Sequence, residues 1–173
     1  MPGDLQRPTF NGQLVIDGNL NADTITGSSY RNWMIGGGIF ASSQERKTKA
    51  VDVLTGTQGA LDVFDLRTSD FSGDAYSGVN TGSAQINHYT QGEDFIVLSG
   101  LQGSYDIVAQ TKTSGRGWRR QTITTGYQIF SSKQLVATIA PAAGTTFTGS
   151  ADTDLSVLYG QSGDPTETLL NGQ

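Results

Sequence analysis

The chain has no cysteine and only one histidine, His88, among its 173 residues. The absence of cysteine excludes disulfide scaffolds, thiolate metal sites and cysteine nucleophiles. No window approaches the roughly 18 apolar residues of a membrane-spanning helix, and the N-terminus lacks the basic region and apolar run of a secretory signal. We therefore expect a protein that is made in the cytoplasm without an export signal and does not insert into a membrane.

Charge is also sparse. Lys, Arg, Asp and Glu make up 16% of the residues, and the formal net charge is −5. Nucleic-acid binding needs clustered Lys and Arg to neutralise phosphates, and here the basic residues are scattered, so we expect no nucleic-acid partner. Gly and Thr are abundant, which favours strands and tight turns over helices.

Catalytic signals are weak. His88 lies in a polar stretch, and no G-x-S-x-G motif supports a Ser-His-Asp triad around it. The pairs Glu93-Asp94 and Asp152/Asp154 could in principle hydrolyse a glycosidic bond or bind calcium, but exposed turn carboxylates are the simpler interpretation, and a 12-residue calcium loop is missing. The run Gly36–Gly38 lacks the strand-turn-helix context of a dinucleotide site. We expect no catalytic residue, no metal and no cofactor, and hence no enzyme.

Short strands with Gly or Ser between them are expected along most of the chain. The clearest lie at 13–16, 50–54, 60–64, 95–98, 105–111, 118–124, 127–130, 134–139 and 155–159. Because no strands alternate with convincing helices, a parallel α/β sheet is disfavoured. The sequence predicts an all-β protein with an extended N-terminal segment, residues 1–28, followed by an antiparallel β-sandwich or jelly-roll-like domain, residues 29–173.

One near-repeat stands out, because Ala50–Leu54 is echoed at Ala60–Phe64. This pattern predicts a hairpin with its valines buried and with Asp52 and Asp62 facing outward. No other fixed-period repeat is visible, so the long solenoid of a glycan-degrading tailspike enzyme is not expected. Residues 65–94 are polar and aperiodic, which is typical of a long functional or mobile loop.

The segment Phe10–Gly27 is apolar only at intervals. Its apolar side chains are separated by Gly, Asn, Asp and Thr, which predicts extended rungs with turns, too thin to form a core alone. Four residues are therefore candidates for oligomerisation or docking: Leu14, Ile16, Leu20 and Ile25.

Within this segment, "LVIDGNLNADTI" resembles a pattern that recurs in tail fibres and tail-tip proteins of tailed bacteriophages and in related phage-tail-like bacteriocins. The resemblance implies a structural protein of the virion tail, made in the host cytoplasm and assembled as a homotrimer. Its N-terminus would attach to other tail proteins, and its distal domain would contact a bacterial surface glycan or protein. A head-decoration, head-fibre or neck protein without receptor binding is the alternative.

The stretch "TSGRGWRRQT", residues 113–122, is the most suggestive chemically. Two predicted strands are joined there by a glycine-containing tip that carries Arg116, with Trp118, Arg119 and Arg120 starting the return strand. Trp and Arg often anchor interfaces, and they could stack on a sugar ring and donate to an acidic glycan. Alternatively, Trp118 packs inward and the arginines are solvated or paired with a neighbouring subunit.

Overall fold

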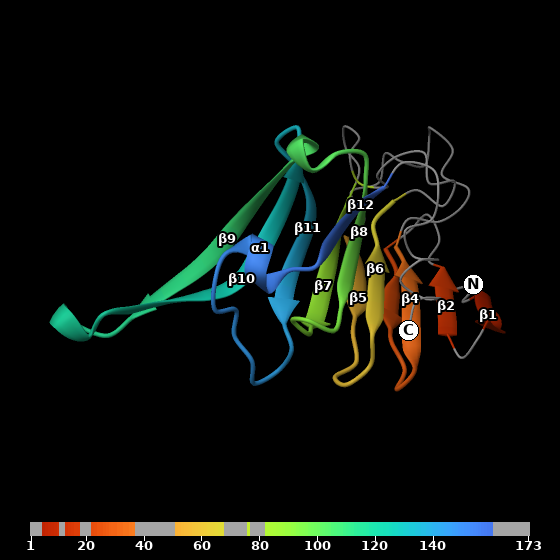
Figure 1. Cartoon of the computed structure of the whole chain (residues 1–173), viewed down its shortest axis with the longest axis horizontal. Coiled ribbons are helices and arrows are strands. Elements are labelled where there is room, and N and C mark those ends of the chain that lie inside the picture. The colour runs from red at the N-terminus through yellow and green to blue at the C-terminus, as the bar shows by residue number, and fades with distance from the viewer. Residues whose placement is uncertain are drawn as a thin grey trace.

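The computed structural model describes residues 5–10, 13–17, 22–36, 51–67, 76 and 82–160, and it describes side chains from residue 22 onward. These residues are mostly in strands (Figure 1). The elements are β1 (Leu5–Phe10), β2 (Gln13–Asp17), β3 (Thr24–Thr26), β4 (Arg31–Ile35), β5 (Val51–Thr55), β6 (Asp62–Asp65), β7 (Ser83–Tyr89), β8 (Phe95–Ser99), η2 (Gln102–Ser104), β9 (Tyr105–Ser114), η3 (Gly117–Arg119), β10 (Gln121–Ser131), β11 (Gln134–Pro141), α1 (Ala151–Asp154) and β12 (Val157–Gly160).

The strands form two six-stranded sheets. Sheet A has the order β1-β2-β4-β6-β8-β12 and is parallel apart from the β1–β2 pair at its edge. Sheet B has the order β3-β5-β7-β11-β10-β9. Its first four strands are parallel, and β10 and β9 continue it as an antiparallel pair.

From β2 to β8 the chain alternates between the two sheets, so that each strand pairs in parallel with the strand two places further along. Val51 pairs with Ser83 in sheet B, and Val63 pairs with Phe95 in sheet A, each 32 residues further on. Stacked rungs of this kind make a short parallel β-solenoid. After the β9–β10 hairpin, the chain returns to the two sheets and adds one more strand to each stack: β11 pairs with β7, and β12 pairs with β8.

The core lies between the two sheets and is built from side chains that repeat from rung to rung. In sheet B, consecutive register partners form a buried aliphatic column of Ile25, Leu54, Ile86 and Ile139. In sheet A, Met34, Phe64 and Ile96 are register partners and face this column in one apolar cluster. Each rung therefore buries its apolar face against the next rung as well as against the opposite sheet.

The expected antiparallel β-sandwich or jelly roll is wrong, because most strand pairings of the body are parallel and connect different rungs. The expected hairpin over residues 50–64 is also wrong, since β5 belongs to sheet B and β6 to sheet A. Side-chain alternation explains the error about its aspartates. Asp52 shares a face with Leu54, and Asp62 shares a face with Phe64, so both carboxylates are buried and Val51 is 43% exposed instead.

The stretch 65–94 contains a strand that the sequence did not indicate. β7 lies in the middle of sheet B and buries Ala84, Ile86 and Tyr89. Buried and exposed residues alternate only from Ser83 to Asn87, because His88, with φ +58°, breaks the alternation before Tyr89. That short signal is hidden among the glycines and serines that surround it.

The N-terminal segment continues both sheets. β2 pairs in parallel with β4, and β3 pairs in parallel with β5. Strands on both sides of the expected boundary between residues 28 and 29 thus belong to the same two sheets. The division of the chain at this boundary stays a prediction.

Candidate functional site

The β9–β10 hairpin extends well beyond the rest of the molecule and projects from it as an arm (Figure 1). β11 pairs with β10 only over Tyr127–Ser131, so the outer part of the hairpin is a two-stranded ribbon. Every residue from 108 to 122 is exposed. We call these residues the arm, and the other described residues the body.

The tip of the arm carries the four residues that the sequence singled out. Arg116 precedes the single turn η3, Trp118 and Arg119 lie within it, and Arg120 leads into β10. The expected hairpin is confirmed, but the return strand begins at Gln121, so the expectation that Trp118, Arg119 and Arg120 start it is wrong. The alternative in which Trp118 packs inward is wrong, because this side chain is 88% exposed.

Backbone geometry and stacking define the shape of the tip. Gly115 has φ +91°, and a Cβ added there would collide with the carbonyl oxygen of Arg119, so only glycine fits. The guanidinium carbon of Arg119 lies 4.8 Å from the centroid of the Trp118 ring, which is a cation–π arrangement. Below the tip, the hydroxyls of Thr113 and Thr122 are hydrogen-bonded across the ribbon at 3.0 Å.

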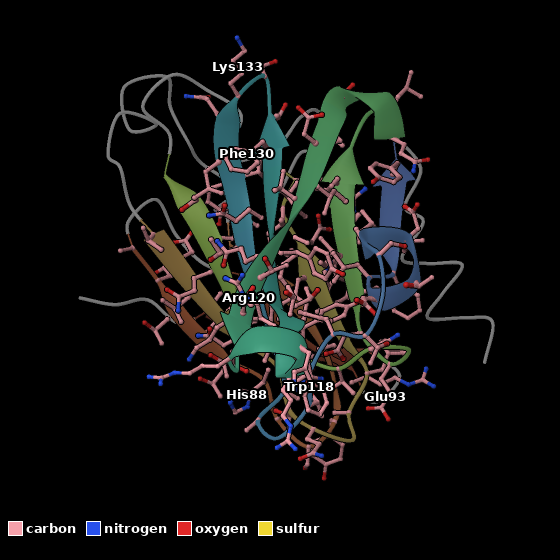
Figure 2. All side chains as sticks on the ribbon, turned by 90° about the vertical axis from the view of Figure 1, so that its left-hand side faces the viewer. His88, Glu93, Trp118, Arg120, Phe130 and Lys133 are labelled. Carbon is pink, nitrogen blue, oxygen red and sulfur yellow. The ribbon has the colours of Figure 1, made fainter. Side chains whose placement is uncertain are left out.

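The arm differs sharply in charge from the rest of the chain. Residues 107–151 contain five Lys or Arg and no Asp or Glu, whereas the remaining residues contain six Lys or Arg and sixteen Asp or Glu. Four of these five cations lie on the arm, and the fifth, Lys133, lies in the turn between β10 and β11. In Figure 2, Lys133 lies at the opposite end of β10 from Trp118 and Arg120.

A second constellation lies in the body, at the connections that lead from a sheet B strand to the next sheet A strand. We call these connections, residues 27–30, 56–61 and 90–94, the short corners. Three buried polar side chains lie in equivalent places at the end of these corners or at the start of the strand that follows: Asn32, Asp62 and Asp94. Asn32 is the register partner of Asp62, and Asp94 directly precedes Phe95, the partner of Val63, so the three form a polar ladder across three rungs.

Each side chain of the polar ladder forms hydrogen bonds with backbone groups of its own corner. Asp62 accepts from the Thr57 N–H at 2.6 Å, and Asp94 accepts from the Thr90 N–H at 2.7 Å. Asn32 donates to the carbonyls of Ser28 and Tyr30 and accepts from the Ser28 N–H. The rungs are also linked to each other, because Asn32 Nδ2 donates to Asp62 Oδ1 at 2.5 Å and the Asp62 N–H donates to Asp94 Oδ1 at 3.0 Å.

Two of the short corners share a sequence motif that none of the sequence-based predictions used. The motif is a turn with the sequence Thr-Gln-Gly, at residues 57–59 and 90–92. In each turn, the N–H of the residue after the glycine donates a hydrogen bond to the carbonyl of the threonine. The third residue of each motif is a glycine with φ near +80°. The rungs could have been predicted from this repeated Thr-Gln-Gly motif, which is followed by an Asp four or five residues after its Thr.

Burial changes the proton affinity of these carboxyls. It raises the pKa of Asp94 to about 7 and also raises the pKa of Asp62, against the lowering effect of their hydrogen bonds. Burial also raises the pKa of Asp52 to about 6, although this carboxylate accepts hydrogen bonds from the Tyr76 hydroxyl and the Asp23 N–H. These groups join rungs and loops within the body, and their shifts need no substrate to explain them.

Asp154 is buried in a different way. Its carboxylate accepts from the Tyr127 hydroxyl at 2.6 Å and from the backbone N–H of Thr148 and of Gly149. These bonds outweigh its desolvation and lower its pKa. The carboxylate thus anchors the loop that precedes α1 to β10.

The interpretation of the acidic pairs as exposed turn carboxylates is therefore only half right. Glu93 and Asp152 are exposed, whereas Asp94 and Asp154 are buried. His88 is exposed on β7 with φ +58°. Within the described part of the chain, no group of three His, Cys, Asp or Glu side chains could hold a metal ion.

Three of the four N-terminal candidates lie in the first rung. Leu14 and Ile16 belong to β2, where their register partners are Asn32 and Met34. Ile25 is buried in the core, and Leu20 lies outside the described residues. Their role in oligomerisation or docking stays a prediction.

Among the helices that the structure describes, none is long and apolar enough to cross a membrane. No family model, curated protein or solved structure matches the chain.

Proposed function

We propose that the protein is a structural, non-enzymatic component of a tailed-bacteriophage virion, a tail fibre or tail-tip protein that assembles as a homotrimer. The observation that carries the proposal is the position of the segment that resembles tail fibres. Phe10–Gly27 contributes β2 and β3, which form the first rung of the solenoid. A segment of this kind joins the chain to further strands by continuing its sheets.

The strand edges support an assembling role. In sheet A the outermost strands are β1 and β12, and in sheet B they are β3 and β9. Within the described part of the chain these four strands have one neighbour each. Open edges of parallel sheets readily pair with another chain, so a protein of this kind functions best inside an assembly that covers them.

The polar ladder supports a structural role for the buried carboxyls. Their oxygens accept hydrogen bonds from backbone N–H groups at the corners, so these carboxyls hold the rungs together. Four of the five exposed cations among the described residues lie on the arm, which gives the molecule one distinct contact surface.

The test is to raise antibodies against the purified chain and to label purified phage particles from lysates in which the chain is expressed. Gold label at the tail, seen by negative-stain electron microscopy, is the expected result. Label on the head would favour the decoration or neck alternative, and particles that carry none of the chain would contradict the proposal.

A further inference from the structure

The arm exposes both faces of a ribbon over fifteen consecutive residues, 108–122. A two-stranded hairpin alone is marginally stable in water, because neither face buries apolar surface. Its most exposed large apolar residue is Trp118, a residue type that is enriched at the centres of interfaces. The whole ribbon, and not only its tip, therefore requires a covering surface.

We propose that the arm of one copy docks on the body of a second copy, with the cations of its tip against the exposed carboxylates of Glu93 and Asp152. This proposal rests on the proposed function only in taking the chain to be an oligomer. It names the element that joins the copies and the surface that receives it.

Charge complementarity identifies a second copy as the occupant. The arm carries Lys112, Arg116, Arg119 and Arg120 and no acidic residue. The chain outside residues 107–151 has ten more acidic than basic residues. Complementary potentials of this kind steer association and fix which surfaces meet.

The receiving surface is a built feature of the body, which we call the acidic corner, Glu93 and Asp152. Gln91 Nε2 donates to the Thr153 carbonyl at 3.0 Å, so the turn that bears Glu93 contacts the helix that bears Asp152. The neighbouring buried residues Asp94 and Asp154 hold these two segments in place through backbone N–H groups. Apart from the acidic corner, the only fully exposed acid of the described residues is Asp106, at the base of the arm.

The cations of the tip form no ion pair with another described residue, although Arg119 stacks on Trp118. The one ion pair among the described residues joins Arg67 to Asp65, in the body. Figure 1 shows the tip extended away from the stacked rungs. The guanidiniums of Arg116, Arg119 and Arg120 are thus available to a neighbouring copy.

Contact between an arm and an acidic corner joins two different surfaces. Repeated around a rotation axis, such a contact closes into a ring in which every chain gives one arm and receives one arm. This closed arrangement agrees with a homotrimer and leaves no unmatched arm.

Light scattering coupled to size exclusion tests the proposal with a charge swap. Arg119→Glu with Arg120→Glu, and separately Glu93→Arg with Asp152→Arg, should each reduce the mass at micromolar concentration from that of an oligomer to that of a monomer. A chain that carries all four substitutions should regain the oligomeric mass, because a negative tip then meets a positive corner. Lys133→Glu, which removes an exposed cation away from the arm, should leave the mass unchanged, and circular dichroism checks that every variant is folded.

Three results would overturn the proposal. If each two-residue reversal keeps the wild-type oligomeric mass, the copies are joined elsewhere, and the virion role can still stand. If the four-residue variant stays monomeric while folded, the tip and the corner are not partners. A monomeric wild type whose mobility shifts with alginate, a soluble polymer of uronic acids, would assign the tip to an acidic glycan instead.

Discussion

The body and the arm are both made of short strands, yet different interactions hold them in place. In the body, Leu54 lies on Ile86 and Ile86 on Ile139, so each strand is fixed by residues that lie 32 or 53 positions away in the sequence. In the arm, Thr113 faces Thr122 across a local hairpin, and no side chain between 108 and 122 is buried. Burial of stacked side chains stabilises the first region, whereas turn geometry and local contacts between exposed side chains shape the second.

The largest expected difference between the regions is their response to truncation. Ile86→Ala should lower the free energy of unfolding by about 3 kcal/mol, because it leaves a cavity in the middle of a fully buried column. Val108→Ala removes a similar apolar group from the arm and should change the free energy by less than about 0.5 kcal/mol. Urea titration followed by circular dichroism measures both, and equal losses would contradict the comparison.

The free energy of unfolding should also depend on pH through buried groups of the body and not through the arm. The pKa of Asp94 is raised to about 7 and that of Asp52 to about 6, so the folded body binds their protons more tightly than the unfolded chain does. The stability that this binding contributes is complete below the unfolded pKa of about 3.9 and is lost as pH rises through the folded values. The free energy of unfolding should therefore fall between about pH 4 and pH 7.

The groups around Asp94 allow a control for this profile. Its carboxyl lies near Asp62 and Glu93, whose charges also raise its pKa. Asp94→Asn should flatten the fall, and Asp106→Asn, a change at an exposed carboxylate, should leave the fall as it is. Below about pH 4 the lowered pKa of Asp154 acts in the opposite direction, so protonation of Asp154 lowers stability there. Stability that rises from pH 4 to pH 7 would refute the assignment.

Removal of the arm should matter little to the fold of a single chain. Thr111 and Thr124 are register partners, so a two-residue Asn-Gly turn can join them in place of residues 112–123. In dilute solution, the free energy of unfolding should stay within about 1 kcal/mol of wild type, because the deleted side chains bury almost no surface. A loss of several times that amount would show that the arm belongs to the core.

The smallest effect is expected at the tip. Gly115→Ala places a Cβ against the carbonyl oxygen of Arg119 at a positive φ, which costs about 1–2 kcal/mol locally. The expected result is a shift of the amide resonances of residues 114–120 with an unchanged urea midpoint. Gly103→Ala, whose Cβ would meet nothing, is the matched control. A tip that keeps its resonances after Gly115→Ala would contradict the described turn.

The contrast between the regions also explains what the sequence could predict. The hairpin of the arm was predictable because its strands, its turn and its glycines lie within about 25 residues and define each other locally. The parallel pairings were not, because the spacing between partners varies along the chain. It is 18 residues from Gln13 to Arg31, 30 from Asn32 to Asp62 and 61 from Ile96 to Val157.

The burial of two carboxylates was the other feature that was not predicted from the sequence. Asp62 and Asp94 were assigned to the surface because isolated carboxylates avoid the interior. Their burial depends on N–H groups of Thr57 and Thr90, which lie four or five residues earlier and become donors only once the corner has formed. The repeated Thr-Gln-Gly turn was visible in the sequence and could have indicated both the rungs and the buried position of these residues.

In our proposal, the body is ordered by its own rungs and the arm by a neighbouring copy. Hydrogen exchange, measured by mass spectrometry at low and at high protein concentration, separates these two kinds of order. Residues 108–122 should become more protected as concentration rises, whereas β6, β7 and β8 should be equally protected throughout. An arm whose exchange does not depend on concentration would contradict this proposal.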